Sequence, residues 1–303
     1  MRPYRRIGNV IGGLLLTASL FVVYRQFGHF NFSDAWREML SLDMWRPFLA
    51  LLLIAADYAV MTQYDRMALS LVGRRLRMRT IAAASFISHV FTINVDMVFG
   101  SSVAFRLYRT LGVSAHEIAT IVFFSNLSFL LGFLGLGAVL FPFATLALPP
   151  SDFLSHVSLR IIGMVCLVAM SIYLTLSILR RQPTGLWKWT IPVVPLATAL
   201  KQVGLAITDW MLAGSAAFVF LPPLHGVPFT VFLAMFLLSQ LLGQLSQAPA
   251  GLGVFEASML YLLSSYAPSP AIFGALLLYR LTYYLLPLFL GTALLAWHEW
   301  RRL

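Results

Sequence analysis

Long apolar runs are the feature that most restricts how this chain can fold. About 20 apolar residues are enough for a helix to cross the hydrocarbon core of a membrane. Such runs are predicted at 7–24, 47–68, 118–141, 159–179, 203–221 and 270–297. Of the 303 residues, 60% are hydrophobic and only 11% are charged, against about 25% charged in typical soluble domains. The sequence therefore predicts an all-α polytopic membrane protein, a single integral membrane domain over residues 1–303, and argues against a nucleic-acid-binding or soluble catalytic protein.

Two further apolar stretches, 81–99 and 229–266, are interrupted or unusually polar. The first contains Ser88, His89 and Asn94, and the second contains a break at Pro249–Gly253. Non-helical backbone at membrane depth is tolerated only where protein or a water-filled cavity satisfies its polar groups. We therefore expect two polar hairpin or re-entrant segments beside about six full spans, or about eight transmembrane helices in all.

The basic residues predict the orientation in the membrane. The net charge of +10 comes from 21 Lys and Arg residues against 11 acids, and the basic groups cluster in short connections such as 74–79 and 180–188. Basic connections stay in the cytoplasm. Placing all of them there requires 81–99 to enter and leave on the same side. We therefore predict a multi-pass protein of the bacterial plasma (inner) membrane with both termini cytoplasmic.

Several features recur at half the chain length. Asp57 and Asp209 are separated by this interval, and so are Gly100 and Gly251. With the predicted topology the two halves, 47–141 and 203–297, would be inverted repeats, although a chance match of spacings is the alternative. Transporters with inverted repeats hold a midplane site between discontinuous helices.

Ionisable residues inside apolar runs are costly and suggest function. The candidates are Asp57, Asp65, Asp96, Asp209, Glu256 and Arg280. The alternative to a functional role is mutual pairing that only holds helices together. Glu256 and Arg280 in particular are expected to compensate each other.

The break at Gly251 and Gly253 is the sharpest local feature. Glycine permits close approach to the backbone, and a helix that starts after Gly253 would direct its N-terminal N–H groups at a phosphate or carboxylate. Glu256 in the first turn could cap that helix, pair with Arg280 or receive a cationic head group.

Arg106 and Arg109 share one helical face, where guanidinium groups could bind phosphate. The alternative for these two is anchoring at the cytoplasmic surface. The predicted substrate-binding residues are Arg106, Arg109, Gly251, Gly253, Glu256, Arg280, Asp57 and Asp209.

Four blocks of this sequence resemble the transmembrane half of the lysylphosphatidylglycerol synthase/flippase (MprF-type) family and its stand-alone YbhN-like members. The blocks are Tyr64–Leu69, Gly100–Tyr108, Pro249–Glu256 and Leu278–Pro287. The chain departs from the family pattern at Ser101, Ala104 and Ala250, where the family has Gly, Arg and Gly.

The resemblance implies translocation of a polar (phospho)lipid between leaflets. The chain ends at Leu303 without the soluble aminoacyl-transfer domain, so it is not expected to be an enzyme that makes the lipid. No cofactor or metal is expected, and the expected partners are membrane phospholipid and possibly a separate lipid-modifying enzyme or a second copy of the chain.

Two other functions stay open at this point. One is an intramembrane transferase for a lipid-linked or hopanoid-type substrate, with Asp34, Glu38 and Asp43 as its acids. The other is a non-catalytic membrane partner of a lipid-modifying enzyme.

Overall fold

The structure of the protein is a computed structural model. It describes residues 43–144, 156–180, 184–186, 189–191, 193–224, 226–246 and 249–300. Within these ranges five helices are long and apolar enough to cross a membrane. They are Trp45–Leu71, Ala115–Leu140, Leu159–Leu179, Leu196–Phe220 and Ser269–His298. This confirms the prediction of an all-α polytopic membrane protein, while the predicted first span at 7–24 lies outside the described residues.

The first half of the described chain contains four helices. They are α3 (Trp45–Leu71), α4 (Met78–Asn94), α5 (Met97–Thr110) and α6 (Ala115–Leu140). Helix α6 begins with a capping box, in which Ser114 Oγ accepts from the N–H of Glu117 and Glu117 accepts from the N–H of Ser114. Such reciprocal bonds satisfy N–H groups that a helix start leaves without partners.

The second half is more interrupted. Helix α7 (His156–Leu179) leads through a two-stranded antiparallel hairpin, β1 (Thr184–Leu186) and β2 (Trp189–Ile191), to α8 (Leu196–Phe220). The elements that follow are α9 (Phe229–Leu245), the 3₁₀ turn η1 (Pro249–Gly251), α10 (Val254–Leu263), α11 (Ser269–Tyr279), the π-helix η2 (Arg280–Leu285) and α12 (Leu286–Trp300).

Helix α8 begins seven residues before the run predicted from 203. The polar residues Lys201 and Gln202 made the start of the run look later. In the structure Gln202 is fully buried, because its Nε2 donates to Ser128 Oγ (2.8 Å) on α6. A polar side chain with a buried partner can therefore extend a membrane helix beyond its apolar run.

The two polar stretches both fold as pairs of short helices. Helices α4 and α5 pack against each other across a turn at Val95 and Asp96, where the Asp96 carboxylate caps α5 by accepting from the N–H of Phe99 (2.7 Å). A Cβ atom at Gly100 would collide with the Thr92 side chain and backbone, so glycine is what lets the limbs approach. Helices α9 and α10 form the second pair. Each polar stretch thus contains a helical hairpin, although the first extends to Thr110, beyond the predicted 81–99. Re-entry of these segments, and the membrane side from which 81–99 enters, stay predictions.

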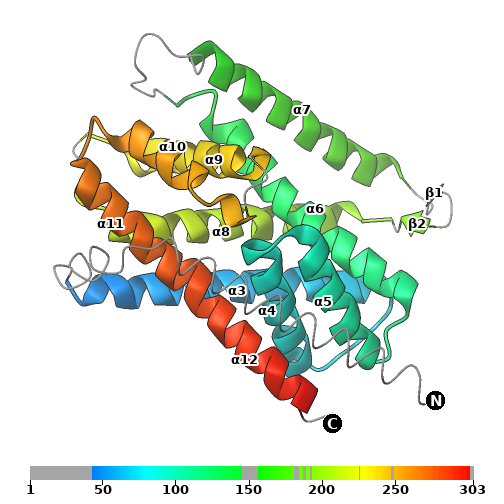
Figure 1. Cartoon of the computed structure of the whole chain (residues 1–303). Helices are drawn as coiled ribbons and strands as arrows, with labels where there is room; N and C mark the ends of the chain where they lie inside the picture. Colours follow the sequence, from blue (N-terminus) through cyan, green and yellow to red (C-terminus); the bar gives the residue numbers. More distant parts are fainter. Residues whose placement is uncertain are drawn as a thin grey trace.

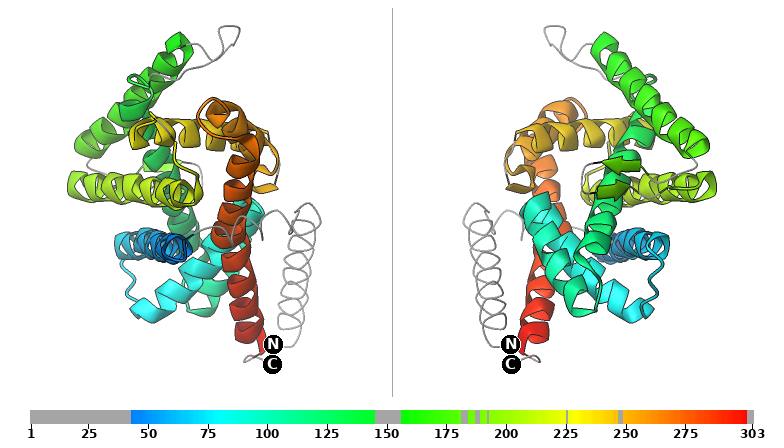
Figure 2. Two further views of the ribbon diagram at one scale, coloured as in Figure 1. Left: turned by 90° about the vertical axis from the view of Figure 1, so that its left-hand side faces the viewer. Right: turned by 90° about the vertical axis from the view of Figure 1, so that its right-hand side faces the viewer.

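The elements follow the same order twice: a long helix, two short helices and a long helix. Helices α3 and α8 pack side by side, and α6 and the α11–η2–α12 rod cross them (Figures 1 and 2). Helix α7 lies on α6 and α8 with most of its surface exposed. The order agrees with half-repeats at 47–141 and 203–297, whose inverted relation stays a prediction.

Candidate functional site

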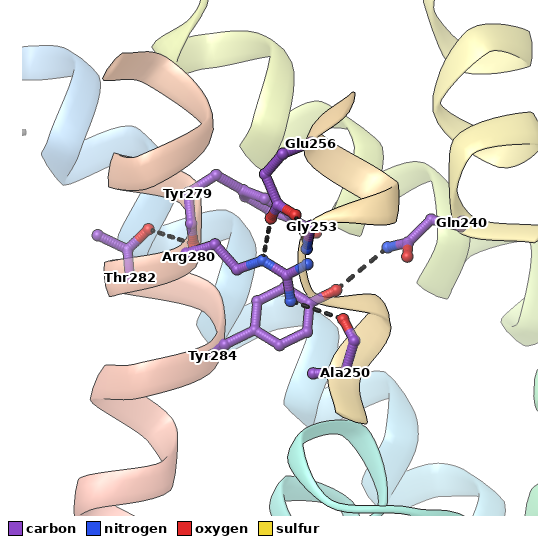
Figure 3. A network of polar contacts seen from close by, with 8 residues as sticks. All are labelled: Gln240, Ala250, Gly253, Glu256, Tyr279, Arg280, Thr282 and Tyr284. Atoms are coloured by element: carbon purple, nitrogen blue, oxygen red, sulfur yellow. Dashed lines mark hydrogen bonds and ion pairs between the residues drawn. The ribbon is translucent and has the colours of Figure 1, made fainter. Parts of the chain in front are cut away.

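Glu256 and Arg280 form an ion pair inside the helix bundle. Arg280 is 1% exposed and Glu256 is 7% exposed. The Arg280 Nε donates to Glu256 Oε1, and the second carboxylate oxygen, Oε2, accepts from the N–H of Gly253 (2.8 Å) at the start of α10. The expected pairing of the two residues is confirmed, and Glu256 also caps its own helix (Figure 3).

Two further contacts hold the Arg280 guanidinium. Its Nη1 donates to the carbonyl oxygen of Ala250 (2.7 Å) in η1, and its Cζ atom lies over the Tyr284 ring at 4.4 Å from the centroid. Tyr284 in turn accepts from Gln240 Nε2 (3.2 Å) on α9 (Figure 3). The Nη2 atom is buried and has no hydrogen-bond acceptor within the described part of the chain. Arg280 therefore has a buried donor nitrogen that the described part of the chain leaves unused.

The backbone conformation at η1 brings the Ala250 carbonyl close to Arg280. Ala250, Gly251 and Gly253 have φ values of 52°, 63° and 82°. Gly251 also lies against Gly243 of α9, because a Cβ atom at Gly251 would be 3.0 Å from the Gly243 Cα. These left-handed conformations turn the chain so that the Ala250 carbonyl faces Arg280. Left-handed backbone costs about 1–2 kcal/mol for a residue other than glycine, and Ala250 carries that strain.

The π-helix η2 has a local cause in the sequence. Pro287 has no N–H to donate to the carbonyl of Tyr283, and a proline ring crowds the carbonyl four residues before it. Widening the helix relieves that crowding, and such π-helical turns are frequent at functional sites. Arg280, Tyr283 and Tyr284 all lie on this turn.

A second polar centre lies where α3 and α8 pack together. Asp57 is 0% exposed and Asp209 is 2% exposed, and their carboxyl groups are in contact. The Tyr283 hydroxyl of η2 donates to Asp57 Oδ2 (2.5 Å), and the Tyr64 hydroxyl donates to Asp209 Oδ2 (2.9 Å). Element η2 therefore contacts both polar centres.

Asp65 forms a third centre that links α3 to α5 and α6. Its Oδ2 accepts from the Tyr108 hydroxyl (2.5 Å) and its Oδ1 accepts from Ser125 Oγ (2.6 Å). These residues border a small cavity of about 20 Å³ that His89 also lines. This carboxylate therefore has a donor for each oxygen.

The structure distributes the predicted residues over separate places. Arg106 is half-buried and Arg109 is exposed on α5, which packs on α4 and α6, whereas Glu256 and Arg280 belong to α10 and η2. The N–H of Gly253 is taken by Glu256. This is the capping role that the sequence offered as one alternative for Glu256, and phosphate binding at Gly251 and Gly253 stays a prediction.

The sequence reasoning missed the aromatic partners of the site. Tyr64, Tyr283, Tyr284 and Gln240 contact the charged residues, yet only acids, arginines and glycines were singled out. The signal was present, because Tyr64 and the Tyr283–Tyr284 pair lie within the blocks that carry the family resemblance.

The acids proposed for a transferase can be placed only in part. Asp34 and Glu38 lie outside the described residues. Asp43 is exposed just before α3, where its carbonyl accepts from the N–H of Arg46 (3.0 Å).

Comparison with known proteins agrees with these features. The family model described as "Lysylphosphatidylglycerol synthase TM region" matches residues 10–291. The chain belongs to this family. It is 33% identical over 288 residues to "Uncharacterized protein slr0712" of Synechocystis sp., which covers 94% of this chain and 89% of that protein. It is 28% identical over 275 residues to "Inner membrane protein YbhN" of Escherichia coli K12, which covers 90% and 85%. The resemblance to stand-alone, YbhN-like members of the lysylphosphatidylglycerol synthase transmembrane family is thus confirmed.

Proposed function

We propose that this protein moves a polar phospholipid between the leaflets of the bacterial inner membrane. The observation that carries the proposal is the buried Arg280–Glu256 pair beside the broken helix at η1. Arg280 reaches it from the π-helix and Glu256 from the first turn of α10. The family description, which names a transmembrane region of a lipid synthase, supports the same direction.

Stability alone is a poor explanation for such a pair. Removing two charges from water costs several kcal/mol per ion, and apolar residues of similar volume often stabilise a protein as well or better. The charges therefore point to a polar ligand. The arginine fork suits a phosphate, and the carboxylate suits a cationic head group.

The geometry supports an exchange of partners during transport. In the conformation described here Arg280 is held by Glu256 and by the Ala250 carbonyl, while Nη2 has no acceptor among the described residues. A lipid phosphate can replace the Ala250 carbonyl and use Nη2 as its second donor, while Glu256 turns to the amine of the head group. The acyl chains stay in the bilayer.

This proposal assigns no chemical step to the chain itself. We expect a transporter that is not an enzyme, with a separate lipid-modifying enzyme as the source of its substrate. Location in the inner membrane is proposed because the relative YbhN is named an inner membrane protein.

The orientation can be tested with single cysteines. Cys166 is the one cysteine in the sequence, so Cys166→Ala gives a background for Arg77→Cys in the α3–α4 connection. We expect a membrane-impermeant thiol reagent to label Arg77→Cys only after the membrane is opened. Labelling in intact cells would show that this connection faces the outside of the cell and would contradict the predicted orientation.

The function is tested by reconstitution. Purified protein is inserted into liposomes that carry a phospholipid with a fluorophore on one acyl chain, and a membrane-impermeant quencher reports the lipids that reach the outer leaflet. Head groups are compared as phosphatidylglycerol, lysylphosphatidylglycerol and phosphatidylethanolamine. We expect wild type to accelerate movement of at least one of them, and Arg280→Lys to be slow because a lysine loses the fork.

Two controls make the result specific. Arg74→Lys changes an exposed arginine that also pairs with a glutamate, so it should move lipid at the wild-type rate. The acids of the transferase alternative are replaced together as Asp34→Asn, Glu38→Gln and Asp43→Asn, and this variant should also remain active. Wild-type liposomes that match protein-free liposomes for every head group would overturn the proposal.

A further inference from the structure

The contact between Asp57 and Asp209 places two carboxyl groups together in the interior of the bundle. One comes from α3 and the other from α8, the two helices that pack side by side. Both are essentially inaccessible, at 0% and 2%. Two carboxylates that share a dry site cannot both be ionised without strong repulsion, and one of them keeps a proton.

The hydrogen bonds of the pair agree with a shared proton. Each residue accepts one tyrosine hydroxyl at its Oδ2, Tyr283 at Asp57 and Tyr64 at Asp209. No donor among the described residues reaches Asp57 Oδ1. The contact between the two carboxyl groups therefore becomes a hydrogen bond only when one of them is protonated.

Asp65 shows that burial by itself does not produce this arrangement. It is also 2% exposed, yet both of its oxygens accept from hydroxyl groups, those of Tyr108 and Ser125. Asp65 is therefore a matched internal control, a buried aspartate on the same helix as Asp57 whose two oxygens both have a hydroxyl donor.

The other titratable groups around the pair come from three elements besides α3 and α8. They are Tyr58 and Tyr64 on α3, His89 on α4, Tyr279 on α11, and Tyr283 and Tyr284 on η2. Five of these groups are tyrosines, which are neutral near pH 7, and the sixth is a histidine. His89 is half-buried and lines the cavity of about 20 Å³, which is enough for one water molecule. His89 is therefore the neighbour that the test below must separate from the pair.

We propose that Asp57 and Asp209 form a proton-binding site that couples lipid movement to the proton gradient. With one proton the pair carries a single negative charge and a hydrogen bond that joins α3 to α8. Loss of the proton leaves two negative charges, which repel each other and weaken the contact between α3 and α8. The coupling step rests on the proposed lipid transport, whereas proton binding does not.

Proton binding is tested by infrared spectroscopy on the full chain in lipid nanodiscs. Aspartate labelled with ¹³C identifies the C=O band of a protonated aspartic acid. We expect the band in wild type and in Asp65→Asn, and its loss in Asp57→Asn and Asp209→Asn. An asparagine at 57 has the same shape and can donate to Asp209, so Asp57→Asn mimics the protonated pair and should fold. Absence of the band in wild type, its persistence in Asp57→Asn, or its loss in Asp65→Asn would overturn the assignment.

Coupling is tested in the liposome assay with an imposed pH difference across the membrane. We expect the gradient to change the rate of lipid movement in wild type, Asp65→Asn and His89→Gln, and the response to be lost in Asp57→Asn. The His89 variant excludes the histidine as the titrating group. An equal response in Asp57→Asn, or no response in active wild type, would overturn the coupling. Wild type without any lipid movement would instead overturn the proposed function and leave the infrared result standing.

Discussion

Arg280–Glu256 and Arg74–Glu117 are the same chemical pair in two different surroundings. The side chains of the first are 2% and 10% exposed, and those of the second are 46% and 19% exposed. In both, the glutamate is the third residue of a helix and accepts from the N–H at the helix start, Gly253 in one and Ser114 in the other. The local helix chemistry is therefore alike, and the difference lies in the access of water.

That difference changes what it costs to separate the two partners of each pair. An exposed pair forms and breaks at little cost, because water replaces either partner. A buried pair cannot lose one partner without leaving a charge in a medium that solvates it poorly. Arg74 and Glu117 thus need only help α6 to start, whereas Arg280 and Glu256 need a replacement ligand whenever they separate.

The largest effect is expected from breaking the buried pair on one side. Arg280→Gln leaves Glu256 without its cation and should lower the free energy of unfolding by about 3–5 kcal/mol. The measurement is SDS-induced unfolding from mixed detergent micelles. A loss no larger than that of Arg74→Gln would contradict the contrast between the two sites.

Replacing both charges tests whether the pair is kept for stability. In Glu256→Gln/Arg280→Met no charge is left uncompensated, so most of the lost stability should return. Lipid movement should remain absent, because the phosphate and amine ligands are gone. A double variant that transports lipid at the wild-type rate would show that the pair has no part in transport.

Two turn glycines allow a smaller and matched comparison. Gly251 (φ 63°) precedes the cap of the buried pair, and Gly112 (φ 80°) precedes the cap of the exposed one. Alanine at either position should cost about 1–2 kcal/mol through its left-handed backbone. Gly251→Ala should cost more, since its Cβ atom would meet Gly243 whereas nothing lies within 4 Å of a Cβ atom at Gly112. Equal losses of unfolding free energy in the same SDS titration would mean that α9 shifts to accommodate the added Cβ atom.

The smallest effect is expected from the exposed pair itself. Arg74→Gln should unfold at the wild-type SDS concentration, because both partners are hydrated and surface pairs contribute little. Any difference that is seen at low salt should vanish when salt is raised, since ions screen exposed charges. A difference that persists at high salt would show that Arg74 has a buried partner.

The sequence was sufficient for the parts of the fold that depend on local pattern. Apolar runs placed the described spans, and polar residues with Pro and Gly placed both hairpins. The cost of an isolated charge in an apolar run was enough to pair Glu256 with Arg280. These predictions succeed because each follows from the environment, apolar or polar, that a side chain requires, whichever helix supplies it.

The partners of the buried aspartates could not be predicted in this way. Asp57 and Asp65 lie two turns apart on α3, yet one meets a carboxyl group of α8 and the other meets hydroxyl groups of α5 and α6. Which neighbour each one meets depends on how the helices pack against one another, and the apolar pattern does not determine this. The packing also decides where Arg106 and Arg109 lie. Their helix, α5, packs on α4 and α6 and not beside the Arg280–Glu256 pair, so their role in phosphate binding stays a prediction.

The π-helix η2 connects the Arg280–Glu256 pair to the Asp57–Asp209 pair. Arg280 at its start binds Glu256, and Tyr283 one turn later binds Asp57, so a change of helical register in this six-residue segment moves both side chains together. Thermodynamic linkage then makes the influence mutual: whatever factor protonation of the aspartates imposes on lipid affinity, lipid must impose on proton affinity. Adding lipid should therefore shift the pH midpoint of the aspartic acid band, and by the same factor as pH shifts lipid binding.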